Sequence, residues 1–179
     1  MVSAKSAVIF ETGRIRLRSS TREDLDFVLG LELDTDNAPF ILRWPAKMHL
    51  DTISDPDRAH LTVEARESGQ PVGYVILSAL KSPHRSIEFV RMTIARKGEG
   101  YGRECLRAVK QMAFDTLGAH RLWLDVMSHN ARAKSLYLAE GFVEEGTLRE
   151  SVEVDGRRIS LILLSMLARE FKQEQMRSQ

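Results

Sequence analysis

The stretch TIARKGEGYGR, residues 93–103, joins a β-prone apolar segment to a segment of helical periodicity at 103–117. Its three glycines at alternate positions let the backbone bend sharply and approach a ligand, because glycine has no Cβ. A helix that begins directly after them directs free N–H groups and the positive end of its dipole at the loop. Strand, glycine loop and helix N-terminus together predict a phosphate-binding site, to which Lys97 adds a positive charge. An ordinary flexible turn is the alternative interpretation.

The length and composition of the chain are those of an ordinary globular protein: it has 179 residues, of which 43% are hydrophobic and 28% charged. We expect a single domain over residues 1–179, with loosely ordered ends at 1–12 and 169–179. A net charge of +1 gives no electrostatic reason to expect nucleic acid or a membrane surface as partner. No segment is typical of a signal peptide or long enough to span a membrane, so we expect a cytoplasmic protein.

Metal and disulfide chemistry find no support in the sequence. Cys105 is the single cysteine, which excludes an internal disulfide and a cysteine metal cage. It falls on the apolar stripe of the helix predicted after the glycine loop, so we interpret it as a core residue. The five histidines show no metal-ligand spacing, and we expect no metal.

Hydrophobic periodicity and turn signals predict the order βα(α)βββαβαββ. A helix with a capping box at Ser20–Glu23 follows the first strand, and Asn130 caps a later helix. This order indicates one α/β (α+β) domain with a mixed, mostly antiparallel twisted sheet flanked by helices. The predicted strands lie at 14–18, 60–67, 71–77, 86–95, 120–127, 143–153 and 158–167.

The strand before the glycine loop changes phase. Ile87 and Phe89 are apolar at alternate positions, and then Val90, Met92 and Ile94 are. A shift of one residue in a period of two predicts a β-bulge, a feature that often adjoins active sites. A strand buried on both faces would show the same letters.

Residues 40–56 are the least regular part of the chain and carry several large apolar side chains. One interpretation is a loop that packs onto the body of the protein. The other is the lining of a substrate site, because binding residues concentrate on such loops. Phe40 and Trp44 are our candidate substrate-binding residues.

Several nucleotide and hydrolase motifs fail. No Gly-Lys-Ser/Thr closes the glycine loop as in a P-loop, and no G-x-S-x-G is present. A dinucleotide fingerprint breaks at its third glycine, where Arg103 or Cys105 stands. An NAD(P)-dependent oxidoreductase, with Asp125 at a plausible distance for a ribose contact, stays as a rival.

Two blocks carry a family resemblance. The loop KGEGYG, residues 97–102, resembles the R/Q-x-x-G-x-G/A motif of the GNAT superfamily of N-acetyltransferases. The block NARAKSLYLAEGF, residues 130–142, independently resembles the superfamily's N-x-x-A-x-x-L-Y-x-x-x-G-F signature. From Glu88 to about Leu167 the chain is most similar to the branch of ribosomal-protein-alanine and spermidine N-acetyltransferases. The resemblance implies acetyl-CoA as co-substrate and a GNAT-like fold.

The resemblance also implies a cofactor site. Backbone amides of the glycine loop are expected to hold the pyrophosphate of acetyl-CoA. Lys97 departs from the family pattern, because a lysine keeps the charge and loses the fork geometry of arginine. Arg103 and Lys134 are expected at phosphates or, alternatively, as solvated helix residues, and Asn130 at the pantetheine arm, at a catalytic water, or simply as a cap. The candidate cofactor-binding residues are Met92, Thr93, Ile94, Lys97, Gly98, Glu99, Gly100, Tyr101, Gly102, Arg103, Asn130 and Lys134.

A thioester can acylate an amine directly, given a neutral amine, a polarised carbonyl and a proton for the leaving thiolate. Amides around Met92–Ile94, freed by the expected bulge, would polarise the carbonyl. Tyr137 occupies the position of the family's usual general acid, and its alternative is a core aromatic. Glu88 is the candidate base, directly or through water, unless it is a strand-end residue that faces solvent.

The sequence thus predicts an acetyl-CoA-dependent N-acetyltransferase that acts on a primary amine. The acceptor is a small molecule or a protein N-terminus, and nothing in the sequence selects between them. A non-catalytic acyl-CoA sensor is a further alternative. The branch resembled also makes a homodimer an expectation.

Overall fold

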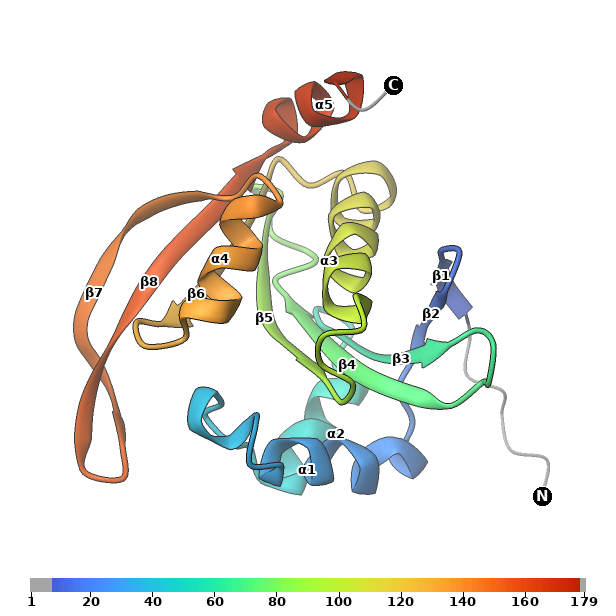
Figure 1. Cartoon of the computed structure of the whole chain (residues 1–179). Coiled ribbons are helices and arrows are strands. Elements are labelled where there is room, and N and C mark those ends of the chain that lie inside the picture. The colour runs from blue at the N-terminus through green and yellow to red at the C-terminus, as the bar shows by residue number, and fades with distance from the viewer. Residues whose placement is uncertain (1–7, 178–179) are drawn as a thin grey trace.

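One eight-stranded sheet runs through the part of the chain that the structure, a computed structural model, describes: residues 8–177 (Figure 1). The strands lie in the order β1-β2-β3-β4-β5-β6-β8-β7. Neighbouring strands are antiparallel except β5 and β6, which are parallel. Their bounds are β1 (Val8–Glu11), β2 (Ile15–Ser19), β3 (Ala59–Ala65), β4 (Pro71–Ser78), β5 (Ser86–Ile94), β6 (Arg121–Met127), β7 (Val143–Val154) and β8 (Arg157–Leu167).

Helices cover both faces of this sheet. α1 and α2 lie on one face, α3 and α4 lie on the other, and the β7–β8 hairpin extends away from the body (Figure 1). No helix of the described residues has the length and apolar character needed to cross a membrane. The helices are α1 (Leu25–Leu33), α2 (Ala46–Ser54), α3 (Tyr101–Gln111) with a π-helical turn (Met112–Thr116), α4 (Ala131–Ala139) and α5 (Ala168–Arg177), with 3₁₀ turns at Arg22–Asp24 and Ala38–Phe40.

The predicted order βα(α)βββαβαββ is confirmed from β2 to β8. Two elements lie outside it: β1 and α5 occupy described parts of the segments that we expected to be loosely ordered. α5 is polar along most of its length and docks through Phe171, whose ring stacks on Phe114 at 4.9 Å between centroids. A single apolar anchor leaves little periodicity for a sequence argument to detect. Residues 1–7 and 178–179 of the expected loose ends lie outside the described residues.

The capping box before α1 is displaced by one residue from the predicted position. Thr21 and Asp24 form it, and the Thr21 N–H donates to Asp24 Oδ2 at 2.7 Å. Ser20 is buried instead, with its hydroxyl 2.8 Å from that of Thr62. The prediction was wrong because both pairs of residues fit the capping pattern, and only the strand register places Ser20 in the core.

The predicted bulge in β5 is confirmed. On β4, Ile76 pairs with Arg91 and the next residue, Leu77, pairs with Phe89, so Val90 has no partner there. Phe89 therefore faces the core beside α3, whereas Arg91 faces α1. Because the extra residue reverses the alternation, Ile87 and Phe89 share the core beside α3 with Met92 and Ile94, whereas Val90 packs on the side of α1.

The core has two parts, one on each face of the sheet. The larger part fills the space between the sheet and α3, α4 and α5, and includes Cys105, which is fully buried. Burial raises the pKa of the Cys105 thiol to about 12, so the interpretation of this residue as core is confirmed. The smaller part lies under α1 and consists of Val28, Leu31, Tyr74 and Ile76.

Gly73 on β4 provides a test of how tightly the sheet packs beside the glycine loop. A Cβ at this position would lie 2.5 Å from the Thr93 carbonyl oxygen and 2.6 Å from Ile94 Cδ1. We expect Gly73→Ala to lower the free energy of unfolding in urea by about 3 kcal/mol, because backbone of β5 would have to move. Gly146→Ala, where a Cβ meets nothing within 4 Å, is the matched control. Equal stability of the two variants would contradict the close packing.

Candidate functional site

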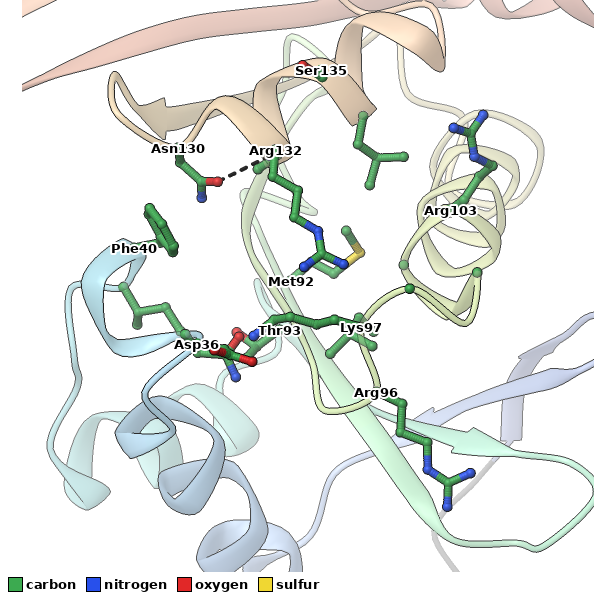
Figure 2. A pocket seen from close by; sticks show the side chains of 18 of the residues that line it. Asp36, Phe40, Met92, Thr93, Arg96, Lys97, Arg103, Asn130, Arg132 and Ser135 are labelled. Carbon is green, nitrogen blue, oxygen red and sulfur yellow. Dashed lines mark hydrogen bonds between the residues drawn. The ribbon is translucent and has the colours of Figure 1, made fainter.

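The main cavity of the described residues lies where β5 and β6 part. Their parallel pairing joins only Ser86–Glu88 to Arg121–Trp123. Beyond it, a cavity of about 890 Å³ is lined by the end of β5, the glycine loop, α4 and the segment 35–41. Figure 2 shows these four parts around one space. The two predicted motif blocks, 97–102 and 130–142, therefore meet at one site.

The glycine loop has the conformation that its sequence requires. Gly98 and Gly100 have φ of +83° and +86°, in the left-handed region that other residues rarely adopt. Gly100 directly precedes α3, so the first N–H groups of the helix are free to bind an anion. These residues line the cavity together with Gly102, as predicted from the spacing.

The β1–β2 turn supports the loop from the side opposite the cavity. Arg14 Nη2 donates to the Glu99 carbonyl oxygen at 3.0 Å, and its guanidinium lies 4.6 Å from the centre of the Tyr101 ring. The Glu104 carboxylate accepts the Arg14 N–H at 2.9 Å. Glu99 and Tyr101, both predicted at the cofactor, do not line the cavity and belong to this support.

Positive charges surround the cavity. Arg96, Lys97, Arg103 and Arg132 all line it, together with the acidic Asp36. Figure 2 shows Arg132 extending from α4 toward the loop, Lys97 reaching across toward Asp36, and Arg96 pointing away from the other side chains. Burial lowers the pKa of Lys97, although nearby Asp36 and Asp34 oppose this shift. Sequence reasoning missed Arg96, which directly precedes the motif, and Arg132, which stands at a variable position of the second block.

Arg103 and Lys134, the two predicted phosphate contacts outside the loop, differ in placement. Arg103 lines the cavity while its Nη1 donates to Glu140 Oε1 at 2.9 Å. Lys134 does not line it, because its Nζ pairs with Glu144 of β7 at 2.8 Å. Helical spacing alone cannot separate the two, since the difference lies in which distant partner each side chain reaches: Glu140 at the end of α4 or Glu144 on β7.

Asn130 caps α4, as predicted, and it also faces the cavity. Its Oδ1 accepts the Ala133 N–H at 3.1 Å. Met92, Thr93 and Ile94 line the cavity as well. The Thr93 side chain is buried and lies next to Tyr74, the residue with which it pairs on β4. Burial raises the pKa of the Tyr74 hydroxyl, and its hydrogen bond to Thr93 acts to lower that pKa.

These features fit a long anionic ligand. The left-handed glycines and the free amides of α3 suit a diphosphate, and the four cations suit a further phosphate group. The mixed polar and apolar lining suits a flexible arm of the same ligand that extends from the diphosphate to β5. The residues present therefore fit acetyl-CoA. Among the described residues, no group of three His, Cys, Asp or Glu side chains is arranged to hold a metal ion.

Neither candidate catalytic side chain lines this cavity. Tyr137 on α4 is buried against Phe89 and Phe142, with ring centroids 6.2 Å and 5.8 Å away. Burial raises its pKa, and Asp125 adds to the shift. Tyr137 is thus a core aromatic by packing whose hydroxyl has no hydrogen-bond partner among the described side chains.

Glu88 lies at the last position of β5 that pairs with β6, opposite Trp123. Desolvation raises its pKa, and the charge of Asp125 on β6 raises it further, while Arg58 opposes the shift. Asp125 therefore affects the pKa of both candidate catalytic groups. The sequence suggests Asp125 only for a ribose contact. Its place next to Glu88 depends on the divergence of β5 from β6, which is not visible in the sequence.

The two candidate substrate-binding aromatics have different positions. Phe40 lines the cavity, with its ring 5.4 Å from that of His129, whose Nε2 lies 3.0 Å from the Pro39 carbonyl oxygen. Trp44 does not line the cavity, because its ring packs under the guanidinium of Arg91 at 4.6 Å. Both interpretations of the segment are therefore partly correct: one end lines the site and the other packs on the body.

Comparison with known proteins agrees with this geometry. The sequence model of the acetyltransferase (GNAT) family matches residues 28–142. A spermidine N(1)-acetyltransferase of Vibrio cholerae serotype O1 is 28% identical over 152 residues, which cover 80% of this chain and 87% of that protein. An uncharacterized N-acetyltransferase of Mycobacterium tuberculosis is 35% identical over 97 residues, covering 53% and 59%.

A solved structure is also similar. Spermidine N-acetyltransferase from Vibrio cholerae in complex with CoA and spermine has a TM-score of 0.79 and 26% identity, over 89% of this chain and 99% of that one.

Gly100 tests the phosphate-binding loop. A non-glycine residue at this φ costs about 1–2 kcal/mol, and a Cβ would lie 3.2 Å from Arg14 Nη1. We expect Gly100→Ala to weaken CoA binding in calorimetry by about tenfold, because the loop would leave the conformation that presents its amides. The control is Gly118→Ala, which places alanine at φ +65° after α3, away from the cavity. Equal CoA affinity of the two variants would remove the loop from the binding site.

Proposed function

We propose, on the premise that the chain belongs to the acetyltransferase (GNAT) family and is an acetyl-CoA-dependent N-acetyltransferase, that its acceptor is a small cationic amine which attacks the thioester directly. Family membership replaces the rival interpretation of an NAD(P)-dependent oxidoreductase. The observation that carries the proposal is the arrangement of charge. Cations line the cofactor cavity, and the carboxylates of Glu88 and Asp125 lie at the fork, the point where β5 and β6 part.

The cofactor half of the site follows from the cavity. Acetyl-CoA supplies the acetyl group as a thioester. The amides at Gly98–Gly102 hold the diphosphate, and Arg96, Lys97 and Arg132 add positive charge beside it. Asn130 and the backbone of Met92–Ile94 lie along the remaining cavity, where N–H groups on the edge of β5 that no longer pairs with β6 would polarise a carbonyl.

The acceptor half follows from Glu88 and Asp125. Their negative charges attract a protonated amine to the fork between the strands. The raised pKa of Glu88 makes its carboxylate a better proton acceptor than an ordinary exposed glutamate, so it can leave the amine neutral for attack. The charge of Asp125 contributes to the raised pKa of Glu88. Desolvation raises the pKa of Asp125 itself.

Tyr137 is the proposed proton donor to the thiolate that leaves. Its raised pKa keeps the hydroxyl protonated at neutral pH, as an acid requires. Its position on α4, in the second motif block next to the cavity-lining Leu136, supports this role. The charge of Asp125 contributes to holding the proton on the hydroxyl before reaction.

A thiol-release assay tests the function as a whole. Spermidine is the first acceptor to try, because relatives that cover most of the chain are named for it. A peptide with a free N-terminal alanine tests the other predicted class of acceptor. Release above the hydrolysis rate with spermidine supports the proposal. Release with the peptide alone, or with neither amine, counts against a small cationic acceptor of this class.

Tyr137→Phe tests the acid. We expect kcat to fall about 100-fold, because the thiolate would leave without a positioned proton donor. Acetyl-CoA affinity should stay within about twofold, since the hydroxyl is not needed for binding. Steady-state kinetics and calorimetry measure the two quantities, and thermal unfolding checks that the core around Phe89 and Phe142 is intact. Unchanged turnover would exclude Tyr137 as the acid.

Asp125→Asn tests the base through pH. Activity requires ionised Glu88, so kcat/KM for the amine falls as pH drops through the pKa of Glu88. Removal of the Asp125 charge lowers that pKa, so the acidic limb of the profile should move to lower pH. The measurement is kcat/KM against pH at saturating acetyl-CoA. A limb that stays in place would show that Glu88 is not the titrating group or that Asp125 does not act on it.

A further inference from the structure

Arg91 is the first residue after the bulge in β5, and its side chain points away from the larger core. The residue pairs with Ile76 on β4, and its side chain is only 9% exposed. It extends over the face that carries α1 and α2, where its guanidinium reaches two separate groups. A buried arginine requires such partners, because an unpaired charge in the interior is strongly destabilising.

The first partner is Glu32, near the end of α1. Its carboxylate, 2% exposed, accepts from Arg91 Nη1 and, at 2.6 Å, from the Tyr74 hydroxyl. The Trp44 backbone N–H donates to the other carboxylate oxygen at 3.1 Å. Glu32 thus joins α1, the sheet and the segment before α2 in one buried polar group.

The second partner is the segment before α2 itself. Arg91 Nη2 donates to the Leu42 carbonyl oxygen at 2.5 Å, and the guanidinium lies 4.6 Å from the centre of the Trp44 ring. Residues 42–44 are therefore held at three points by two side chains. This segment has no regular secondary structure of its own, so these contacts determine its position.

The same segment forms a wall of the site. Phe40 and Ile41 line the cavity, directly before the residues that Arg91 holds. Phe40 lies across the cavity from Arg103, away from the glycine-loop amides assigned to the diphosphate (Figure 2), so we call residues 39–44 the acceptor wall. Its other end is tied to His129 through the Pro39 carbonyl oxygen. On β5, Met92–Ile94 line the cavity directly after Arg91.

We propose that Arg91, paired with Glu32, is a positioning residue that fixes the acceptor wall relative to Met92–Ile94, and thereby sets the fit of the amine acceptor. The kinetic part rests on the proposed function, because it requires an amine acceptor. Arg91 itself does not line the cavity, so its effect on the reaction passes through Leu42 and Trp44.

A second arginine provides a matched control. Arg18 on β2 donates to Asp24 at 2.6 Å and 2.7 Å and to Glu64 at 2.6 Å. It holds the beginning of α1 as Arg91 holds its end, and its side chain is 16% exposed. Among the described residues, the Arg18 guanidinium donates to Glu64, Asp24 and the Ser19 carbonyl oxygen and to no residue of the acceptor wall. Arg18→Lys therefore tests the loss of an ion pair at α1 without displacement of that wall.

The experiment compares Arg91→Lys with Arg18→Lys in the full chain. Lysine keeps the charge and loses the simultaneous contacts to Glu32, Leu42 and the Trp44 ring. In Arg91→Lys we expect hydrogen exchange of amides 40–44 to accelerate about tenfold and KM for spermidine to rise about tenfold, while the Kd of acetyl-CoA stays within about twofold. In Arg18→Lys we expect exchange at 40–44 and KM for spermidine to stay at the wild-type values.

Glu32→Gln is the second variant if Arg91→Lys folds poorly. The amide can still accept the Trp44 N–H, while the charge that holds Arg91 is removed, so we expect the same changes in smaller measure, about threefold. Unchanged exchange at 40–44 in both variants overturns the proposal, as does an equal change in Arg18→Lys. Accelerated exchange at 40–44 with no turnover of spermidine by the wild type supports the positioning role and refutes the acceptor class instead.

Discussion

The β-bulge at Val90 is the constraint on which the rest of the site depends. One unpaired residue in β5 reverses the alternation of its side chains, so Phe89 packs in the core beside α3 while Arg91 faces α1. A regular strand would place Arg91 on the face of Phe89 and leave Glu32 with a buried charge and no cation. Met92–Ile94 keep their pairing with β4, and their other edge is open to the cavity because β5 pairs with β6 only at Ser86–Glu88.

Charge divides the site into two regions. The cavity of the glycine loop carries Arg96, Lys97, Arg103 and Arg132, whereas the fork between the strands carries Glu88 and Asp125. In the proposed function, an anionic cofactor and a cationic amine are each attracted to a different region and meet where β5 and β6 part. The net charge of the whole chain, +1, does not reveal this separation, because it sums all 26 lysines and arginines and all 25 acidic residues wherever they lie.

Buried polar groups connect this site to the scaffold. Burial alone would raise the pKa of Glu32, but contacts to His49 and Tyr74 and the charge of Arg91 lower it to about 2. Glu32 is therefore ionised across the physiological range, and its pairing with Arg91 does not change with pH there. Burial and the neighbouring His49 lower the pKa of His60 to about 4, so this buried histidine stays neutral under the same conditions.

Local patterns in the sequence were sufficient for the order of elements from β2 to β8, the bulge, the glycine loop and the cap at Asn130, because each depends on residues close together in the chain. Only the tertiary structure decided that Lys134 turns to Glu144, that Arg132 enters the cavity, and that Trp44 lies under Arg91. The physical reason is the same in each case. A side chain's partner is set by which distant strand or helix packs beside it, and periodicity specifies a face of an element without specifying what that face meets.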